Sequence, residues 1–187
     1  MSHRLVSYER CSLNGFHPKH VTTVSLMLGW NGIAYMGAYR SLVATCLMLD
    51  AELEPVQTIR CDSPFILTAF DSAEFAGLST TGRIEHNAIR VKLPLFDMPQ
   101  EVANIAFKLG SKYESIPPVS SVLHLTVANH KRDDLCHMSL EFEHSEVLVA
   151  NFSRTAFGWD ITGYGVSLEP SGLSAIQELI RNGSNCS

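Results

Sequence analysis

The sequence predicts an α+β fold: a single domain in which an antiparallel β-sheet packs against one long helix in the amino-terminal half and one short closing helix. Residues 33–50 form an apolar run with the spacing of a buried helix. Residues 84–168 break into short alternating runs separated by Pro and Gly. Residues 173–180 repeat apolar side chains at amphipathic helical spacing. A chain of 187 residues has the length of one domain.

The first part of the chain is expected to be an arm followed by a strand and the long helix. Residues 1–20 predict an irregular arm, because Asn14-Gly15 and His17-Pro18 are turn signals. Residues 21–28 are β-branched and apolar, which predicts a strand that begins a globular domain of residues 21–187. The helix is then expected from Ile33 to Asp50, since its apolar residues fall largely at helical spacing.

The middle of the chain, residues 51–83, leaves two interpretations open. Residues 56–60 indicate a short strand. The segment Phe65–Phe70 is either a buried strand or an exposed loop. As a loop it would form an apolar patch of the kind that marks partner or membrane contacts.

Strand signals strengthen in the second half. Alternation predicts strands around Ile89–Leu93, Leu123–Val127 and Met138–Phe142, and the charged turn Lys131–Asp134 makes the last two an antiparallel hairpin. A short apolar run spans residues 102–109, residues 147–152 begin a helix or a strand, and residues 163–168 indicate a late strand. Asn182-Gly183 stops the closing helix.

Charge is distributed unevenly along the chain. The net charge of −5 argues against non-specific nucleic-acid binding. Residues 1–40 nevertheless carry a net charge of +3, to which Arg4, Arg10 and Lys19 contribute. A basic segment on an acidic body favours contact with anionic lipid or with the acidic face of another copy.

The cysteines and the chain start indicate an intracellular protein. Five cysteines at irregular spacing, with no Cys-x-x-Cys pair, argue against a disulfide scaffold or a zinc ribbon. The start lacks the apolar run of a signal peptide, and no run approaches the roughly 20 residues that span a bilayer.

Candidate chemistry is sparse, and the expectation is a protein without catalytic residues, metal ligands or cofactor. His130, His137 and His144 recur every seven residues, but extended chain would place them on alternating faces. For the same reason Cys136 cannot use His137 as its base on a strand. Phe152, Phe157 and Trp159 form an aromatic segment, for which core packing is expected and an interface is the alternative.

Local segments resemble the globular domain of rhabdovirus matrix proteins. Residues 123–127 followed by Asp133-Asp134 resemble that family's central strand and its acidic turn. Residues 164–169, then Ser171-Gly172 and the closing helix, resemble its last strand, turn and helix. Residues 95–110 are similar to the stretch before the central strand. The Lys-rich tail and the Pro-Pro-x-Tyr motif of better-known members are not present.

The resemblance implies a non-enzymatic viral structural protein that self-associates and bridges the nucleocapsid and the inner face of an anionic membrane. It implies a location in the host cytoplasm and the virion, and no recognition of a nucleic-acid sequence. The implied membrane or self-association contacts are Arg4, Arg10, Lys19, Phe65, Ile66, Leu67 and Phe70. Two alternatives stay open: a coat-type or accessory binding protein without lipid contact, and a small ligand-binding or enzyme domain.

Overall fold

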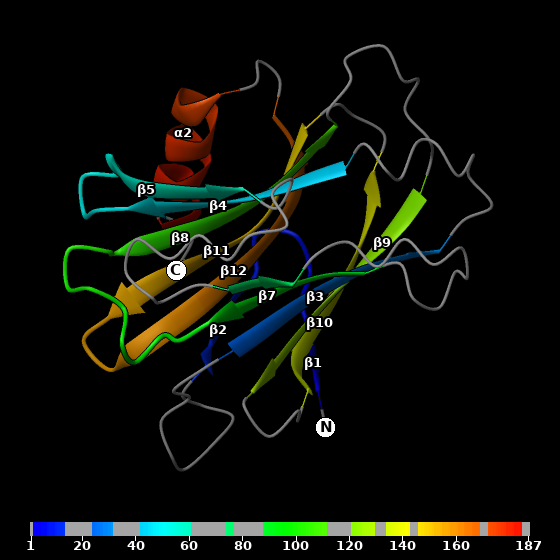
Figure 1. Ribbon diagram of the computed structural model, residues 1–187, viewed down its shortest axis with the longest axis horizontal. Coiled ribbons are helices and arrows are strands. Elements are labelled where there is room, and N and C mark those ends of the chain that lie inside the picture. Colours follow the sequence, from blue (N-terminus) through cyan, green and yellow to red (C-terminus); the bar gives the residue numbers. More distant parts are fainter. Residues whose placement is uncertain are drawn as a thin grey trace.

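The protein is a β-sandwich with one described helix. The computed structural model describes residues 2–13, 24–31, 42–60, 74–76, 88–111, 121–129, 134–142, 146–168 and 172–184. Within these residues the strands form two six-stranded sheets that face each other, and the helix α2 lies outside them (Figure 1).

The first sheet, sheet A, has the strand order β1-β10-β9-β3-β7-β6. Its strands are β1 (His3–Arg4), β10 (Asp134–Phe142), β9 (Ser121–Asn129), β3 (Val24–Asn31), β7 (Ala88–Leu93) and β6 (Glu74–Ala76). All neighbours pair antiparallel except β1, which runs parallel to β10.

The second sheet, sheet B, has the order β2-β12-β11-β8-β4-β5 and is antiparallel throughout. Its strands are β2 (Arg10–Ser12), β12 (Gly158–Ser167), β11 (Glu146–Thr155), β8 (Asn104–Ser111), β4 (Leu42–Leu49) and β5 (Pro55–Arg60). The long central strands of this sheet carry the candidate site described below.

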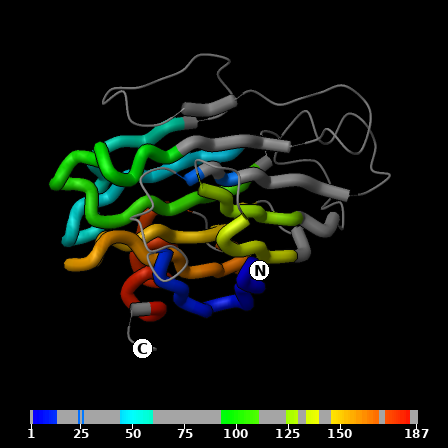
Figure 2. Tube along the Cα trace, turned by 90° about the horizontal axis from the view of Figure 1, so that it is seen from below, coloured from blue at the N-terminus to red at the C-terminus, as the bar shows by residue number. Residues whose placement is uncertain are grey.

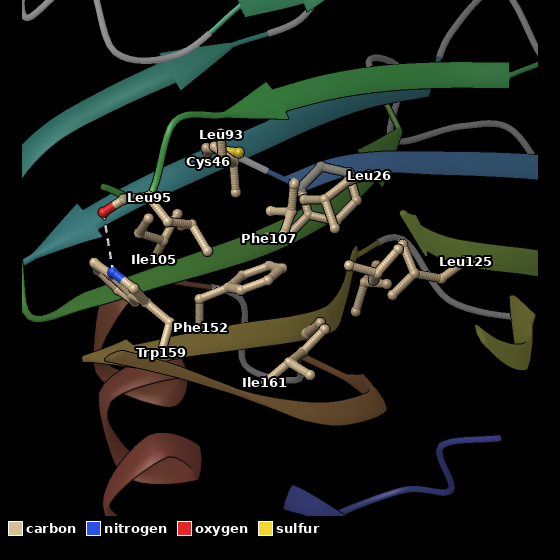
Figure 3. Close-up of a cluster of buried hydrophobic side chains, with 14 of the residues drawn as sticks. Leu26, Cys46, Leu93, Leu95, Ile105, Phe107, Leu125, Phe152, Trp159 and Ile161 are labelled. Carbon is tan, nitrogen blue, oxygen red and sulfur yellow. Dashed lines mark hydrogen bonds between the residues drawn. The ribbon is translucent and has the colours of Figure 1, made fainter. Parts of the chain in front are cut away.

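The main core lies between the sheets (Figure 3). Sheet A contributes Leu26 and Leu125, and sheet B contributes Phe107 and Phe152, all of them fully buried. Trp159 closes one end of this core and donates its indole N–H to the backbone carbonyl of Leu95 at 3.1 Å. That bond satisfies the polar atom of the buried indole.

The helix α2 (Leu173–Ser184) covers part of the outer face of sheet B. Its apolar side, which includes Ile176 and Ile180, packs on Leu49, Leu148 and Tyr164. Sheet B is therefore buried on both faces under the helix, once by sheet A and once by α2.

The amino-terminal strap, residues 2–13, crosses from one sheet to the other (Figure 2). Leu5 donates its backbone N–H to His137 of β10, and Tyr8 donates to Gly163 of β12. Strands β1 and β2 thereby complete one edge of each sheet. These two strands lie within the segment expected to be irregular.

The predicted α+β fold with a long helix in the amino-terminal half is wrong. Residues Leu42–Leu49 form the strand β4, and residues 33–41 lie outside the described part. On β4 the side chains of Cys46 and Met48 face the core between the sheets, whereas Leu47 and Leu49 face α2. A strand buried on both faces loses polar alternation and has the same apolar run as a buried helix.

Several other predictions are confirmed. The hairpin pairs Leu125 with Met138 and Leu123 with Leu140 in antiparallel register. Strands were expected where β3, β5, β7 and β12 lie, and the closing helix is α2. Residues 147–152, left open between helix and strand, belong to β11. No helix in the described part of the chain is long and apolar enough to cross a membrane. The boundary at residue 20 stays a prediction.

Candidate functional site

The outer face of sheet B changes from apolar under α2 to polar beside it. The cross-strand register places Ser153 of β11 between Asn104 of β8 and Asp160 of β12, and Asp160 pairs in turn with Ser12 of β2. Their neighbours Phe152 and Ile161 face the core between the sheets. Because side chains alternate along a strand, these four polar residues share the outer face.

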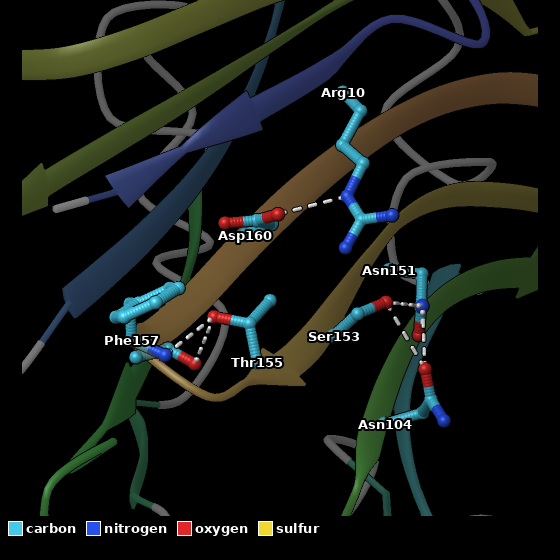
Figure 4. Close-up of polar contacts among 8 residues, drawn as sticks. Arg10, Asn104, Asn151, Ser153, Thr155, Phe157 and Asp160 are labelled. Atoms are coloured by element: carbon cyan, nitrogen blue, oxygen red, sulfur yellow. Dashed lines mark hydrogen bonds and ion pairs between the residues drawn. The ribbon is translucent and has the colours of Figure 1, made fainter. Parts of the chain in front are cut away.

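A hydrogen-bonded group of polar side chains fixes the floor of this region (Figure 4). The Asn151 amide nitrogen donates to Asn104 Oδ1 at 3.1 Å and to Ser153 Oγ at 2.9 Å. Ser153 Oγ donates to Asn104 Oδ1 at 3.1 Å. Asn151 is 1% exposed, and its Oδ1 atom has no hydrogen-bond partner in the described part of the chain. The side chains above it are thereby held in one arrangement.

An open pocket of about 610 Å³ lies over this floor. Its described lining comes from the strap, the β4–β5 turn, the start of β8, the end of β11 and the end of α2. The lining residues are Arg10, Ala51, Leu53, Ala103, Asn104, Ser153, Arg154, Ile180 and Arg181. Three of them are arginines and none is a carboxylate, although the whole chain has a net charge of −5.

Arg10 brings a guanidinium from the strap to the pocket. Its Nε donates to Asp160 Oδ2 at 2.8 Å, and the two side chains are 37% and 17% exposed. This single contact holds the side chain in place but leaves its two terminal nitrogens without a hydrogen-bond partner among the described residues. The planar guanidinium can therefore still bind a carboxylate or phosphate through two parallel hydrogen bonds.

Arg154 has a different role, because it alternates with Ser153 and lies against Trp159 instead of over the floor. Its guanidinium stacks on the Trp159 ring at 4.7 Å from the centroid. It also donates to the carbonyls of Val102, Met98 and Pro99 at 2.7–2.9 Å. Burial lowers the pKa of this guanidinium. Arg154 anchors the connection before β8 and contributes positive charge to the pocket mainly through its field.

Arg181 completes the cationic part from the last turn of α2. It is exposed and makes no hydrogen bond with a described residue. The carboxyl end of a helix carries a partial negative charge of about −0.5, which opposes anion binding nearby. The full charge of Arg181 outweighs it, so the pocket keeps a net positive character.

The described lining offers hydrogen-bond donors. Its described residues include no His, Cys, Asp, Glu, Lys or Tyr, the side chains that commonly act as acid, base or nucleophile. The Ser153 hydroxyl already donates to Asn104. What the arrangement offers is two guanidinium groups beside a neutral polar floor.

Of the seven contact residues that the sequence indicated, the structure places only Arg10 in this pocket. Arg4 is exposed on β1 at the edge of sheet A. Lys19, Phe65, Ile66, Leu67 and Phe70 lie outside the described residues. Sequence reasoning missed Arg181, whose signal was a cation in the last turn of the closing helix, where a ligand-facing end is not distinguishable from a solvated one.

Other candidates have structural surroundings. Cys136 and His137 lie on opposite faces of β10, as alternation predicted, and burial raises the pKa of the Cys136 thiol to about 12. A thiol with such a pKa is a poor nucleophile near neutral pH. Phe152 and Trp159 are in the core as expected, whereas Phe157 is 84% exposed at the β11–β12 turn. His130 and His144 lie outside the described residues.

The two sheets, their strand order and the helix on one outer face define a fold that is shared with two solved structures. The chain has a TM-score of 0.56 to a homologue of the telluride resistance protein TerD from Streptomyces coelicolor A3(2), at 15% identity over 77% of this chain and 88% of that one. The TM-score to SAV2460, a protein of unknown function, is 0.60, at 14% identity over 81% and 95% of the two chains. No protein-family model matches the chain, and no curated protein matches it significantly.

These comparisons overturn the expected resemblance to rhabdovirus matrix proteins. The similar structures are a homologue of a telluride resistance protein and a protein of unknown function, not viral matrix proteins. The viral structural role, the virion location and the nucleocapsid partner depended on that resemblance alone. The positive charges of Arg4 and Arg10 on the strap must therefore be interpreted from their positions in the β-sandwich.

Proposed function

We propose that this chain is a non-enzymatic binding domain that holds a small anion in the pocket on the outer face of sheet B. The observation that carries the proposal is that Arg10 and Arg181 line one pocket whose described lining contains no carboxylate. Arginine is the residue best suited to binding carboxylate and phosphate groups, because its donors match their geometry.

Electrostatics support the pocket as the preferred place for an anion. The chain has 19 acidic side chains against 14 basic ones, so its net charge disfavours anion binding away from local clusters of positive charge. Two exposed guanidinium groups and a third partly buried one raise the local potential at the pocket. Salt should weaken the binding, since the Debye length is about 10 Å at 0.1 M ionic strength.

The absence of enzymatic activity belongs to the same proposal. It is supported by the described lining, which offers hydrogen-bond donors but no group that titrates near neutral pH. A binding domain needs only preorganised donors, and the network around Asn104 and Ser153 supplies a fixed floor for them.

Self-association and contact with anionic lipid stay predictions. Support for self-association comes from Phe96 and Phe157, which are 75% and 84% exposed. Analytical ultracentrifugation of the purified chain would test it. A single monomer species at every concentration measured would contradict it.

Isothermal titration calorimetry at low ionic strength tests the anion site, with inorganic phosphate, acetate and tellurite as probes. Tellurite is included because one fold neighbour is a homologue of a telluride resistance protein. We expect saturable binding of at least one anion that weakens with added salt. Arg181→Gln and Arg10→Gln should each weaken it by at least about tenfold, the cost of one charge-assisted hydrogen bond.

Arg4→Gln is the matched control, because Arg4 is an exposed arginine of the same strap that does not line the pocket. The affinity of the Arg4→Gln variant for each anion should stay within twofold of the affinity of the parent protein. Equal losses in Arg4→Gln and Arg181→Gln, or no saturable binding of any probe, would overturn the proposal.

A further inference from the structure

The two ends of the pocket differ in polarity. Arg10 lies on β2 at one edge of sheet B, whereas Ala51 and Leu53 lie on the turn after β4. The strand order β2-β12-β11-β8-β4 puts four strand spacings between them. Neighbouring strands are about 4.8 Å apart, so the cationic and apolar ends of the pocket are separated by roughly 19 Å.

The helix α2 also runs from the apolar end of the pocket toward its cationic end. Gln177 of α2 donates to the Leu53 carbonyl at 2.9 Å, at the apolar end. Six residues later, Gly183 lies against Tyr164 of β12, on the side of the strap. Arg181 comes just before Gly183, so α2 brings its own cation toward the end that holds Arg10.

The apolar end is rigid. The Asp50 carboxylate accepts hydrogen bonds from the backbone N–H groups of Glu52 at 3.0 Å and Glu54 at 2.8 Å. Leu53 takes a positive φ of 70° in this turn, and its side chain is buried against the helix. Ala103 and Ile180 extend the same surface. A preformed apolar wall binds an apolar group without first having to be ordered.

The pocket is too large and too long for an inorganic anion alone. A water molecule takes about 30 Å³ of liquid volume, so about 610 Å³ has room for about twenty of them. Pockets for small organic ligands have volumes of roughly 300–1,000 Å³. An oxyanion bound to Arg10 would leave the exposed surface of Ala51 and the partly exposed surface of Ala103 in contact with water.

We propose that the ligand of this pocket is an organic anion, a phosphate monoester or a carboxylate that carries a short apolar chain. This rests on the proposed anion site and names the class of ligand that it takes. The charged group lies between Arg10 and Arg181. The apolar chain runs toward Ala51, Leu53 and Ala103.

The first test compares inorganic phosphate, butyl phosphate and hexyl phosphate by calorimetry on the whole chain. Each methylene that becomes buried should tighten binding by about fourfold, so butyl phosphate should bind at least about tenfold tighter than inorganic phosphate. Equal affinities for all three would overturn the ligand class while leaving the anion site intact. No binding of any of them would overturn both.

Salt dependence gives a second measurement that needs no variant. Added salt should weaken all three ligands, because the charged group is shared. The ratio of hexyl to inorganic phosphate affinity should stay constant or rise, because apolar burial is not screened. A ratio that collapses with salt would show that the chain makes no apolar contact.

Ala51→Trp locates the apolar end, since a large side chain on this exposed turn residue would occupy it. Butyl and hexyl phosphate should fall to the affinity of inorganic phosphate, which itself stays within twofold. Ser174→Trp places the same side chain on the exposed first turn of α2, outside the pocket lining. It should change neither the affinity for the alkyl phosphates nor the affinity for inorganic phosphate. Retention of the alkyl preference in Ala51→Trp would contradict the assignment of this end.

Discussion

The two halves of the outer face of sheet B have the same backbone and opposite chemistry. Under α2 the outward side chains include Leu49, Leu148 and Tyr164, which are fully buried. Beside the helix, β8 and β11 present Asn104 and Ser153 to a pocket. The alternation continues without interruption from one half to the other on β8.

The difference follows from which part of the sheet α2 covers, since the polar group lies beside the helix. An exposed sheet face without a helix needs polar side chains, and a covered face needs apolar ones. The sequence of β11 follows this rule within one strand, with Leu148 under the helix and Ser153 in the pocket.

The largest expected effect comes from changing one residue in each half of β11. Leu148→Ala should lower the free energy of unfolding by about 2–5 kcal/mol, because it leaves a cavity under α2. Ser153→Ala should cost about 1 kcal/mol, the value of a hydrogen bond at a partly exposed site. Urea unfolding followed by circular dichroism measures both. Equal costs would show that the two halves are not different environments.

The second prediction concerns Tyr164, which marks the boundary between the two halves. Burial raises the pKa of its phenol to about 12, with a smaller contribution from nearby Tyr8. Since the folded pKa lies above the unfolded value of about 10, the stabilisation is complete below pH 10 and is lost as pH rises toward 12. The loss should be about 2–3 kcal/mol at pH 12.

Urea unfolding between pH 9 and pH 12 measures this loss, with Tyr164→Phe as the control because it cannot ionise. The parent should lose stability more steeply than the variant above pH 10. Parallel curves would show that the phenol is not buried under the carboxyl end of α2.

Much of the sandwich was predictable, because half-buried strands alternate. The β9–β10 hairpin and β7 were found from Leu125, Met138 and Val91, whose neighbours are polar or charged. Strand β4 was not, since Leu47 and Met48 are both apolar and face two different apolar layers. Only the tertiary structure reveals the second layer, α2, which comes more than a hundred residues later in the chain.

The pocket could not be predicted, because its cations are far apart in the sequence. Arg10 and Arg181 lie 171 positions apart and approach each other only through the strap and the last turn of α2. Arg154 is closer to a pattern, but its guanidinium stacks on Trp159. Charge patterning did indicate Arg10, for a membrane contact instead of a pocket.

The third prediction tests how tightly α2 ends on sheet B. A Cβ on Gly183 would lie 2.5 Å from the Tyr164 hydroxyl and 3.3 Å from Cζ. Gly183→Ala should therefore cost up to about 2 kcal/mol, as a clash of about 1–3 kcal/mol is partly offset by the better helix propensity of Ala, about 1 kcal/mol. Thermal unfolding measures the change.

Combining Gly183→Ala with Tyr164→Phe is the matching control, because Phe removes the hydroxyl that the new methyl group would meet. Tyr164→Phe alone loses the hydrogen bond to the Leu179 carbonyl. The double variant should be more stable than the sum of the single changes predicts. Strict additivity would place the clash elsewhere.

The smallest effect concerns Asp160, which holds Arg10 at 2.8 Å beside the pocket. Asp160→Asn should lower the free energy of unfolding by at most about 1 kcal/mol, the value of a surface ion pair. It should also raise the affinity for inorganic phosphate by about threefold, because a negative charge roughly 6 Å from the bound anion is removed. A substitution that weakens the fold and strengthens the binding cannot act through general stability. Calorimetry measures the affinity, and urea unfolding measures the stability. Weaker phosphate binding in Asp160→Asn would contradict the prediction, because it would mean that Arg10 faces the pocket only when it is paired with the carboxylate.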